Sequence, residues 1–120
     1  MAVRRLVANL AVDDPAALAA FYRQVFELDL LMDHGWILTL GGEGRAHAQF
    51  SLASEGGGGA PVPALSVEVD DLEAVLQRAR EAGAAILFEP RDEPWGVRRF
   101  FLRDPAGHIV NVLVHLDADA

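Results

Sequence analysis

Hydrophobic and polar positions alternate along this chain in a pattern that occurs twice. In the first occurrence an apolar run over residues 3–12 predicts a strand. Asp13-Asp14-Pro15 then predicts a helix start, because an aspartate accepts free N–H groups and proline lacks one. The next apolar residues fall on one helix face: Leu18, Phe21, Tyr22 and Val25. Three more strands are predicted, at 29–33, 35–41 and 46–53, and alternation in the last sets Phe50 against the helix.

The second occurrence begins with a predicted strand at residues 63–69. It ends in Val69-Asp70-Asp71, as the first strand ends in Val12-Asp13-Asp14. A second apolar helix face follows, formed by Leu72, Val75, Leu76 and Ala79. Asp70 and Glu73 have the spacing of a capping-box variant, and Gly83 predicts a left-handed helix end. Strands are predicted at 84–89, 97–103 and 108–115, with the charged run Glu89–Pro94 as a solvated loop.

A glycine-rich segment separates the two occurrences. Four consecutive glycines and Pro61 lie within residues 54–62, and this composition is typical of a flexible tether. The predicted order of elements, strand–helix–strand–strand–strand, therefore occurs twice along the chain. We expect a single domain of two modules, module one at about 3–53 and module two at about 63–116.

Composition narrows the classes of function. The 120 residues contain no cysteine, which excludes thiolate metal sites and cysteine nucleophiles. All ten basic residues are arginine, so Schiff-base chemistry is excluded as well. The net charge of −8 argues against nucleic-acid binding and suits a neutral or cationic small partner. No stretch of 18 apolar residues or signal peptide is present, so we expect no membrane association and a cytoplasmic location.

Three segments carry a resemblance to a known superfamily. They are Leu10-Ala-Val-Asp-Asp-Pro…Phe21-Tyr22, Val67-Glu-Val-Asp-Asp-Leu…Ala82-Gly83, and Pro94-Trp-Gly-Val-Arg-Arg-Phe-Phe-Leu-Arg-Asp-Pro-Ala-Gly107. Together they resemble the vicinal oxygen chelate superfamily of glyoxalase I, extradiol dioxygenases and antibiotic-resistance proteins. The last segment is most similar to bleomycin-resistance proteins. The resemblance implies an α+β fold of two βαβββ modules whose curved mixed sheets enclose a cavity, and a homodimer.

The metal-dependent members of this superfamily hold a divalent ion with His and Glu from the first and last strands of each module. The resemblance places Val7, Ser51, Ala64 and Asn111 at the four corresponding positions. Valine and alanine cannot ligate a metal, and serine and asparagine offer only neutral oxygens. We therefore expect no inherited metal site and no cofactor, and the case for an enzyme is open but leans against one.

The remaining candidate residues point to ligand binding. In bleomycin-resistance proteins, aromatic residues at what look like the positions of Trp36 and Trp95 sandwich the planar part of the drug. His47 shares strand parity with Ser51, and His115 with Asn111, so all four are candidates to face the ligand. The alternative is that both tryptophans are core and both histidines are half-buried strand residues. His34 and His108 fall in predicted turns.

Two adjacent pairs leave a choice that alternation alone does not make. Only one of Arg98 and Arg99 points inward in a strand, and only one of Phe100 and Phe101. We place Arg98 among the ligand-binding candidates, where it would need a carboxylate partner or an anionic ligand group. A solvent-facing ion pair is the alternative for either arginine.

The sequence thus predicts a metal-free protein that sequesters a planar or aromatic small molecule, such as an antibiotic. The rival interpretation is a glyoxalase-type lyase, isomerase or dioxygenase with a non-inherited metal site that uses His47 or His115. A third is a non-catalytic partner domain with a vestigial cleft.

Overall fold

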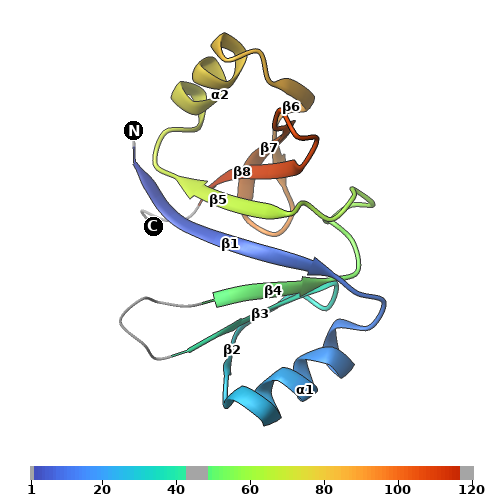
Figure 1. The fold of residues 1–120 in the computed structure, drawn as a ribbon. Coiled ribbons are helices and arrows are strands. Elements are labelled where there is room, and N and C mark those ends of the chain that lie inside the picture. Colours follow the sequence, from blue (N-terminus) through green and yellow to red (C-terminus); the bar gives the residue numbers. More distant parts are fainter. Residues whose placement is uncertain (1, 43–48, 117–120) are drawn as a thin grey trace. The chain divides into compact units, whose positions relative to one another are not determined.

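The computed structural model describes residues 2–42 and 49–116, which fall into two compact units. Val7–Val62 form one, here called the first-module unit. The residues up to Leu6 and those from Pro63 onward form the other, here called the second-module unit. Each unit contains one of the two predicted modules, with a helix packed on a sheet (Figure 1).

In the first-module unit, α1 packs on strands in the order β2-β3-β4-β1. β4 is parallel to β1 and antiparallel to β3, which is antiparallel to β2. The elements are β1 (Val3–Ala11, which belongs to this unit from Val7 onward), α1 (Pro15–Phe26), β2 (Asp29–Asp33), β3 (Ile37–Gly41) and β4 (Gln49–Ala53).

The second-module unit repeats this arrangement with the strand order β5-β8-β7-β6. β8 is parallel to β5 and antiparallel to β7, which is antiparallel to β6. The elements are β5 (Leu65–Val69), α2 (Leu72–Glu81), β6 (Ala85–Glu93), β7 (Val97–Arg103) and β8 (Ile109–His115). The α+β fold of two βαβββ modules with mixed sheets is therefore confirmed.

Aspartates begin both helices. The side chain of Asp14 accepts from the Ala17 N–H at 3.2 Å, and Pro15 follows it, as predicted. In α2 the capping residue is Asp71, which accepts from the Ala74 N–H. The predicted capping role of Asp70 is wrong, because its carboxylate turns to the N-terminal segment and accepts from the Ala2 N–H at 2.7 Å. The predicted left-handed end after α2 is confirmed, with Gly83 at φ 80°.

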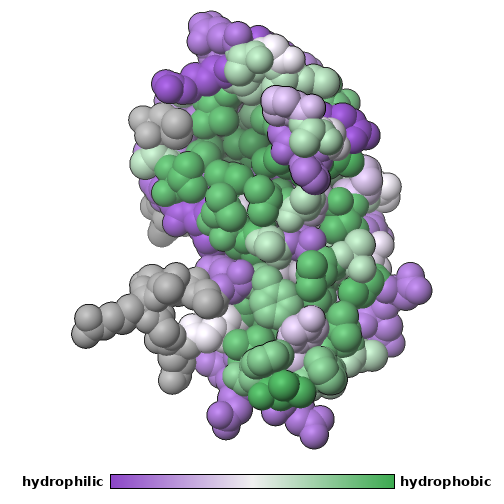
Figure 2. Space-filling view, viewed as in Figure 1, coloured by the Kyte–Doolittle hydropathy of each residue, from purple (hydrophilic) through white to green (hydrophobic). Residues whose placement is uncertain are grey.

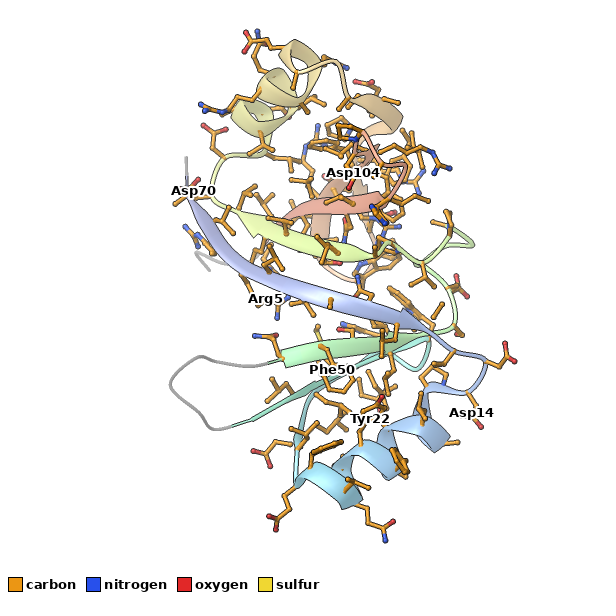
Figure 3. All side chains as sticks on the ribbon, viewed as in Figure 1. Arg5, Asp14, Tyr22, Phe50, Asp70 and Asp104 are labelled. Atoms are coloured by element: carbon orange, nitrogen blue, oxygen red, sulfur yellow. The ribbon has the colours of Figure 1, made fainter. Side chains whose placement is uncertain are left out.

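Each sheet buries one face under its helix. Under α1 the buried residues are Ala19, Leu38, Leu40 and Leu52. The predicted packing of Phe50 against the helix is confirmed, since its ring lies 5.1 Å from that of Tyr22 (Figure 3). Under α2 the buried residues are Val69, Leu72, Leu76, Phe100 and Val112.

The sixth strand is longer than predicted. β6 extends to Glu93, so the charged run at 89–93 is a paired strand and the predicted solvated loop is wrong. The misleading residue is Pro90, which usually ends a strand because it has no N–H. Here the pairing register with β7 shifts between Phe88 and Arg91, and this irregularity accommodates the proline.

The glycine-rich segment forms a hydrogen-bonded loop. Gly56 N–H donates to the Ala60 carbonyl at 2.7 Å, and the Glu55 carboxylate accepts from the Gly59 N–H at 2.7 Å. A Cβ on Gly56 would lie 2.1 Å from the Pro61 carbonyl oxygen, so this position has no room for a side chain. Across the described residues, no helix combines the length and apolar character needed to cross a membrane.

Candidate functional site

Strand alternation places a group of polar side chains on the side of the second-module sheet away from α2. Phe100 and Val112 pack under the helix, so their neighbours along β7 and β8 point to the other side. The residues gathered there include Glu68, Glu93, Arg99, Asn111 and His115. We call this surface the charged face.

Arg99 lies at the centre of the charged face. Its side chain is only 2% exposed, and its Nε lies 2.7 Å from Glu93 Oε2. Burial lowers the pKa of Arg99, and the hydrogen bond and charge of Glu93 oppose that effect. Arg91 also reaches Glu93, at 3.2 Å, so one carboxylate binds two guanidinium groups.

Three aromatic rings surround the Arg99 guanidinium. The carbon at its centre lies 4.8 Å from the ring centre of Trp95, 4.7 Å from Phe101 and 5.7 Å from Phe88. Cations at such distances are attracted to ring faces, more strongly when water is excluded. The half-buried Trp95 is therefore held by a charged group that is itself fixed by Glu93.

A second ion network lies on the first and last strands of this module. His115 Nδ1 lies 3.1 Å from one oxygen of Glu68, and Arg5 Nε lies 3.4 Å from the other oxygen. Arg5 comes from β1 and Glu68 from β5. The side chain of Glu68 is 16% exposed and that of His115 is 32% exposed.

Asn111 lies near the middle of β8 and binds the neighbouring strand. Its Nδ2 donates to the Ser66 hydroxyl at 3.1 Å, across the pairing of β5 with β8. Its buried Oδ1 has no hydrogen-bond partner among the described residues. Asn111, which the resemblance matches to a carboxylate ligand, thus acts here as a link between strands.

Ser51 in the first-module unit is also engaged within the protein. It is buried and shares a 2.7 Å hydrogen bond with Thr39 on the adjacent strand. Asn9 pairs with Ser51 from the other side, so three buried polar residues lie in one row across the sheet.

Of the two remaining candidates in the first module, Trp36 and His47, the structure describes only Trp36. Trp36 lies just before β3 and not within it, because the strand begins at Ile37. Its ring stacks on that of His34 at 6.2 Å. His47 lies outside the described residues.

The choice between Arg98 and Arg99 was left open by the sequence, and Arg99 is the one that shares a face with Asn111 and His115. Arg98 pairs across the sheet with Val114, which packs on the α2 core, and binds Glu73 on that helix at 3.8 Å and Asp92 at 3.1 Å. The same alternation settles the phenylalanines: Phe100 packs under α2, and Phe101 lies on the charged face beside Arg99.

The four residues that the resemblance matches to the superfamily's metal ligands do not form a fitting donor set. Val7 and Ala64 offer no ligand atom, Ser51 is bound to Thr39, and Asn111 binds Ser66 through its amide. Among the residues that the structure describes, no three His, Asp or Glu side chains group closely enough to hold an ion. We therefore derive no step through a metal.

Two carboxylates of the charged face, Glu68 and Glu93, were not among the residues predicted from the sequence, and Arg99 was one of two open choices. Glu68 alternates with Val67 and Val69 on a strand, which marks it as facing away from the helix. Glu93 was not identified, because a solvated loop was expected at residues 89–94. Choosing Arg99 over Arg98 requires knowing which of Phe100 and Phe101 packs under α2.

Comparison with known proteins agrees with this architecture. Residues 4–112 match the model of the Glyoxalase/Bleomycin resistance protein/Dioxygenase superfamily. The chain belongs to this superfamily. An uncharacterized protein from Mycobacterium bovis is 30% identical over 121 residues, covering 83% of this chain and 76% of that protein.

Solved structures share the fold at low sequence identity. A glyoxalase/bleomycin resistance protein/dioxygenase superfamily member from Vibrio splendidus is 17% identical, with a TM-score of 0.62 over 94% of this chain and 99% of that chain. Methylmalonyl-CoA epimerase from Mycobacterium tuberculosis is 20% identical, with a TM-score of 0.67 over 94% and 89%. At these identities the likeness concerns the fold.

Proposed function

We propose that this superfamily member is a metal-free binding protein for a planar, aromatic small molecule, and that it works as a cytoplasmic homodimer. The observation that carries the proposal is the fixation of Trp95 by Arg99. An aromatic side chain held in one orientation loses little entropy when a second ring stacks on it, and such pairs gain about 1 kcal/mol beyond area burial. The poor metal ligands at Val7, Ser51, Ala64 and Asn111 support binding without a metal.

The charges around this tryptophan favour a neutral or anionic ligand over a cationic one. Glu93 already binds Arg91 and Arg99, and Glu68 already binds Arg5. A cationic drug would compete with these arginines for both carboxylates. The overall charge of −8 therefore predicts the ligand less well than the local groups do.

Single-tryptophan variants test the proposal. Trp36→Phe leaves Trp95 as the emitter and Trp95→Phe leaves Trp36, since the chain has two tryptophans. We expect acridine, 2-naphthol or a similar planar compound to change the emission of wild type and of Trp36→Phe. Trp95→Phe serves as the matched control and binds more weakly. Unchanged emission of Trp36→Phe across the whole panel, bleomycin included, would reject the proposal.

The same titrations, repeated with added metal ions, distinguish metal-free binding from the metal-dependent alternative. If Ni, Zn, Mn or Fe is required for binding, or restores a lyase or dioxygenase activity, the enzyme interpretation replaces this one. The proposal predicts that titrations after chelator treatment match those with each added ion.

The proposal of a homodimer is based on exposed apolar side chains of the first-module unit. Five large apolar side chains of α1 and β2 are between 38% and 61% exposed: Phe21, Val25, Phe26, Leu30 and Leu31. Figure 2 shows hydrophobic side chains gathered over α1. Exposed apolar side chains gathered on one helix and the strand beside it mark interaction sites, and a two-fold contact between two copies covers them on both chains at once.

The solution mass measured by light scattering tests the dimer. We expect wild type at twice the chain mass and Phe26→Asp at the monomer mass. Gln24→Glu changes the charge of the same exposed helix outside the apolar set and should stay dimeric. A monomeric wild type contradicts this part of the proposal.

A further inference from the structure

His115 is the most exposed member of the Glu68 network. One ring nitrogen, Nδ1, contacts Glu68 at 3.1 Å, and the side chain is 32% exposed. An ionised carboxylate only accepts hydrogen bonds, so in the neutral ring Nδ1 must carry the proton. Nε2 then has a free lone pair and acts as an acceptor.

Glu68 is held in place to orient this ring. Its two oxygens have different partners, since Oε1 lies 3.4 Å from Arg5 Nε and Oε2 faces His115. Figure 3 shows Arg5 on β1. The carboxylate is 16% exposed and therefore lies largely out of water, where hydrogen bonds of ionised groups are strong.

The strand pairing places His115 beside the turn that carries Trp95. Val97 is the β7 partner of His115, and the Leu116 N–H donates to the Gly96 carbonyl at 2.9 Å. A planar ligand that stacks on Trp95 is thus next to the His115 ring.

From these contacts we infer that His115 is the specificity-determining acceptor of the charged face, and that it selects planar ligands carrying a hydroxyl or ring N–H donor. This inference rests on the proposed function and adds the ligand class. Glu68 acts as a positioning residue, because it fixes the tautomer and orientation of the imidazole.

Calorimetric titration with 2-naphthol and 2-methoxynaphthalene tests the selection. The two probes share the ring system and differ in the donor. We expect 2-naphthol to bind about three- to tenfold more tightly, the range for one net hydrogen bond. His115→Asn, which keeps an N–H donor toward Glu68 but has no acceptor at the position of Nε2, should abolish this preference.

His108 provides the matched control. It makes a comparable contact, with Nδ1 at 3.2 Å from Asp104, but lies in an exposed turn. His108→Asn should leave the preference for 2-naphthol unchanged. Nitrogen NMR of the imidazoles, assigned with His115→Asn, should show the Nδ1–H tautomer at His115, and Glu68→Gln should shift its tautomer ratio.

The outcomes separate the two proposals. Equal affinity for both probes, or an Nε2–H tautomer at His115, overturns the selection by His115 and leaves the planar-ligand proposal standing. Failure of both probes and of the wider panel to bind overturns both. A preference for 2-naphthol that persists in His115→Asn assigns the selection to another residue.

Discussion

Replacing Glu93 by glutamine should destabilise the protein far more than a similar change elsewhere on β6. Glu93 binds Arg99, whose side chain is 2% exposed, and Glu93 itself is 10% exposed. The substitution keeps size and a hydrogen-bond acceptor but removes the charge. It leaves a cation in a place that water cannot reach.

The expected loss follows from the cost of leaving a buried charge without its counter-ion. Breaking a buried pair by removing one partner costs about 3–5 kcal/mol. Glutamine retains a neutral hydrogen bond worth about 1 kcal/mol, so we expect a net loss of about 2–4 kcal/mol. The control is Glu89→Gln, which breaks the Arg80–Glu89 pair on the surface and should cost about 0–1 kcal/mol.

Urea and thermal unfolding of both variants measure this difference. For a chain of this size each kcal/mol lowers the midpoint temperature by roughly 3–6 °C. The double variant Glu93→Gln/Arg99→Met should recover part of the loss, because the uncompensated charge is gone. If Glu93→Gln costs no more than Glu89→Gln, the account of the Arg99 site is wrong.

Two further predictions concern the loop and the N-terminal segment. Gly56→Ala should destabilise by about 1–3 kcal/mol in urea unfolding, because its Cβ would meet the Pro61 carbonyl, while Gly42→Ala, with 3.9 Å to its nearest neighbour, should cost much less. Equal losses would refute the steric argument. The Ala2 N–H lowers the pKa of Asp70, so its stabilisation is complete above the ordinary aspartate pKa and is lost as pH falls through the lowered folded value. Asp70→Asn should therefore lose less stability than wild type between pH 5 and 2, and identical acid profiles would contradict this.

The modular fold was predictable because local and global signals agree. Each helix has an aspartate cap and an apolar face at helical spacing, and the order of predicted elements is the same in both modules. The error at β6 has a local cause, since Pro90 in a charged run predicts a loop and only the irregular pairing with β7 accommodates it.

The charged face was less predictable because it depends on contacts distant in sequence. Alternation shows that Arg98 and Arg99 point to opposite sides, yet it cannot say which side α2 covers. The Glu68–His115 contact joins residues on the first and last strands of the module, and only the parallel pairing of β5 with β8 brings them together. Trp95 was predicted from the resemblance and His115 from its strand parity with Asn111, whereas their partners depend on the packing of the whole module.

Elemental analysis of tag-free protein, combined with its solution mass, tests the central claim most directly. The account predicts a dimer with far less than one transition-metal ion per chain, and planar-ligand binding that chelators leave intact. One tightly bound ion per chain, whose removal abolishes binding, would contradict it and establish a metal site despite the poor ligands that Val7, Ser51, Ala64 and Asn111 offer.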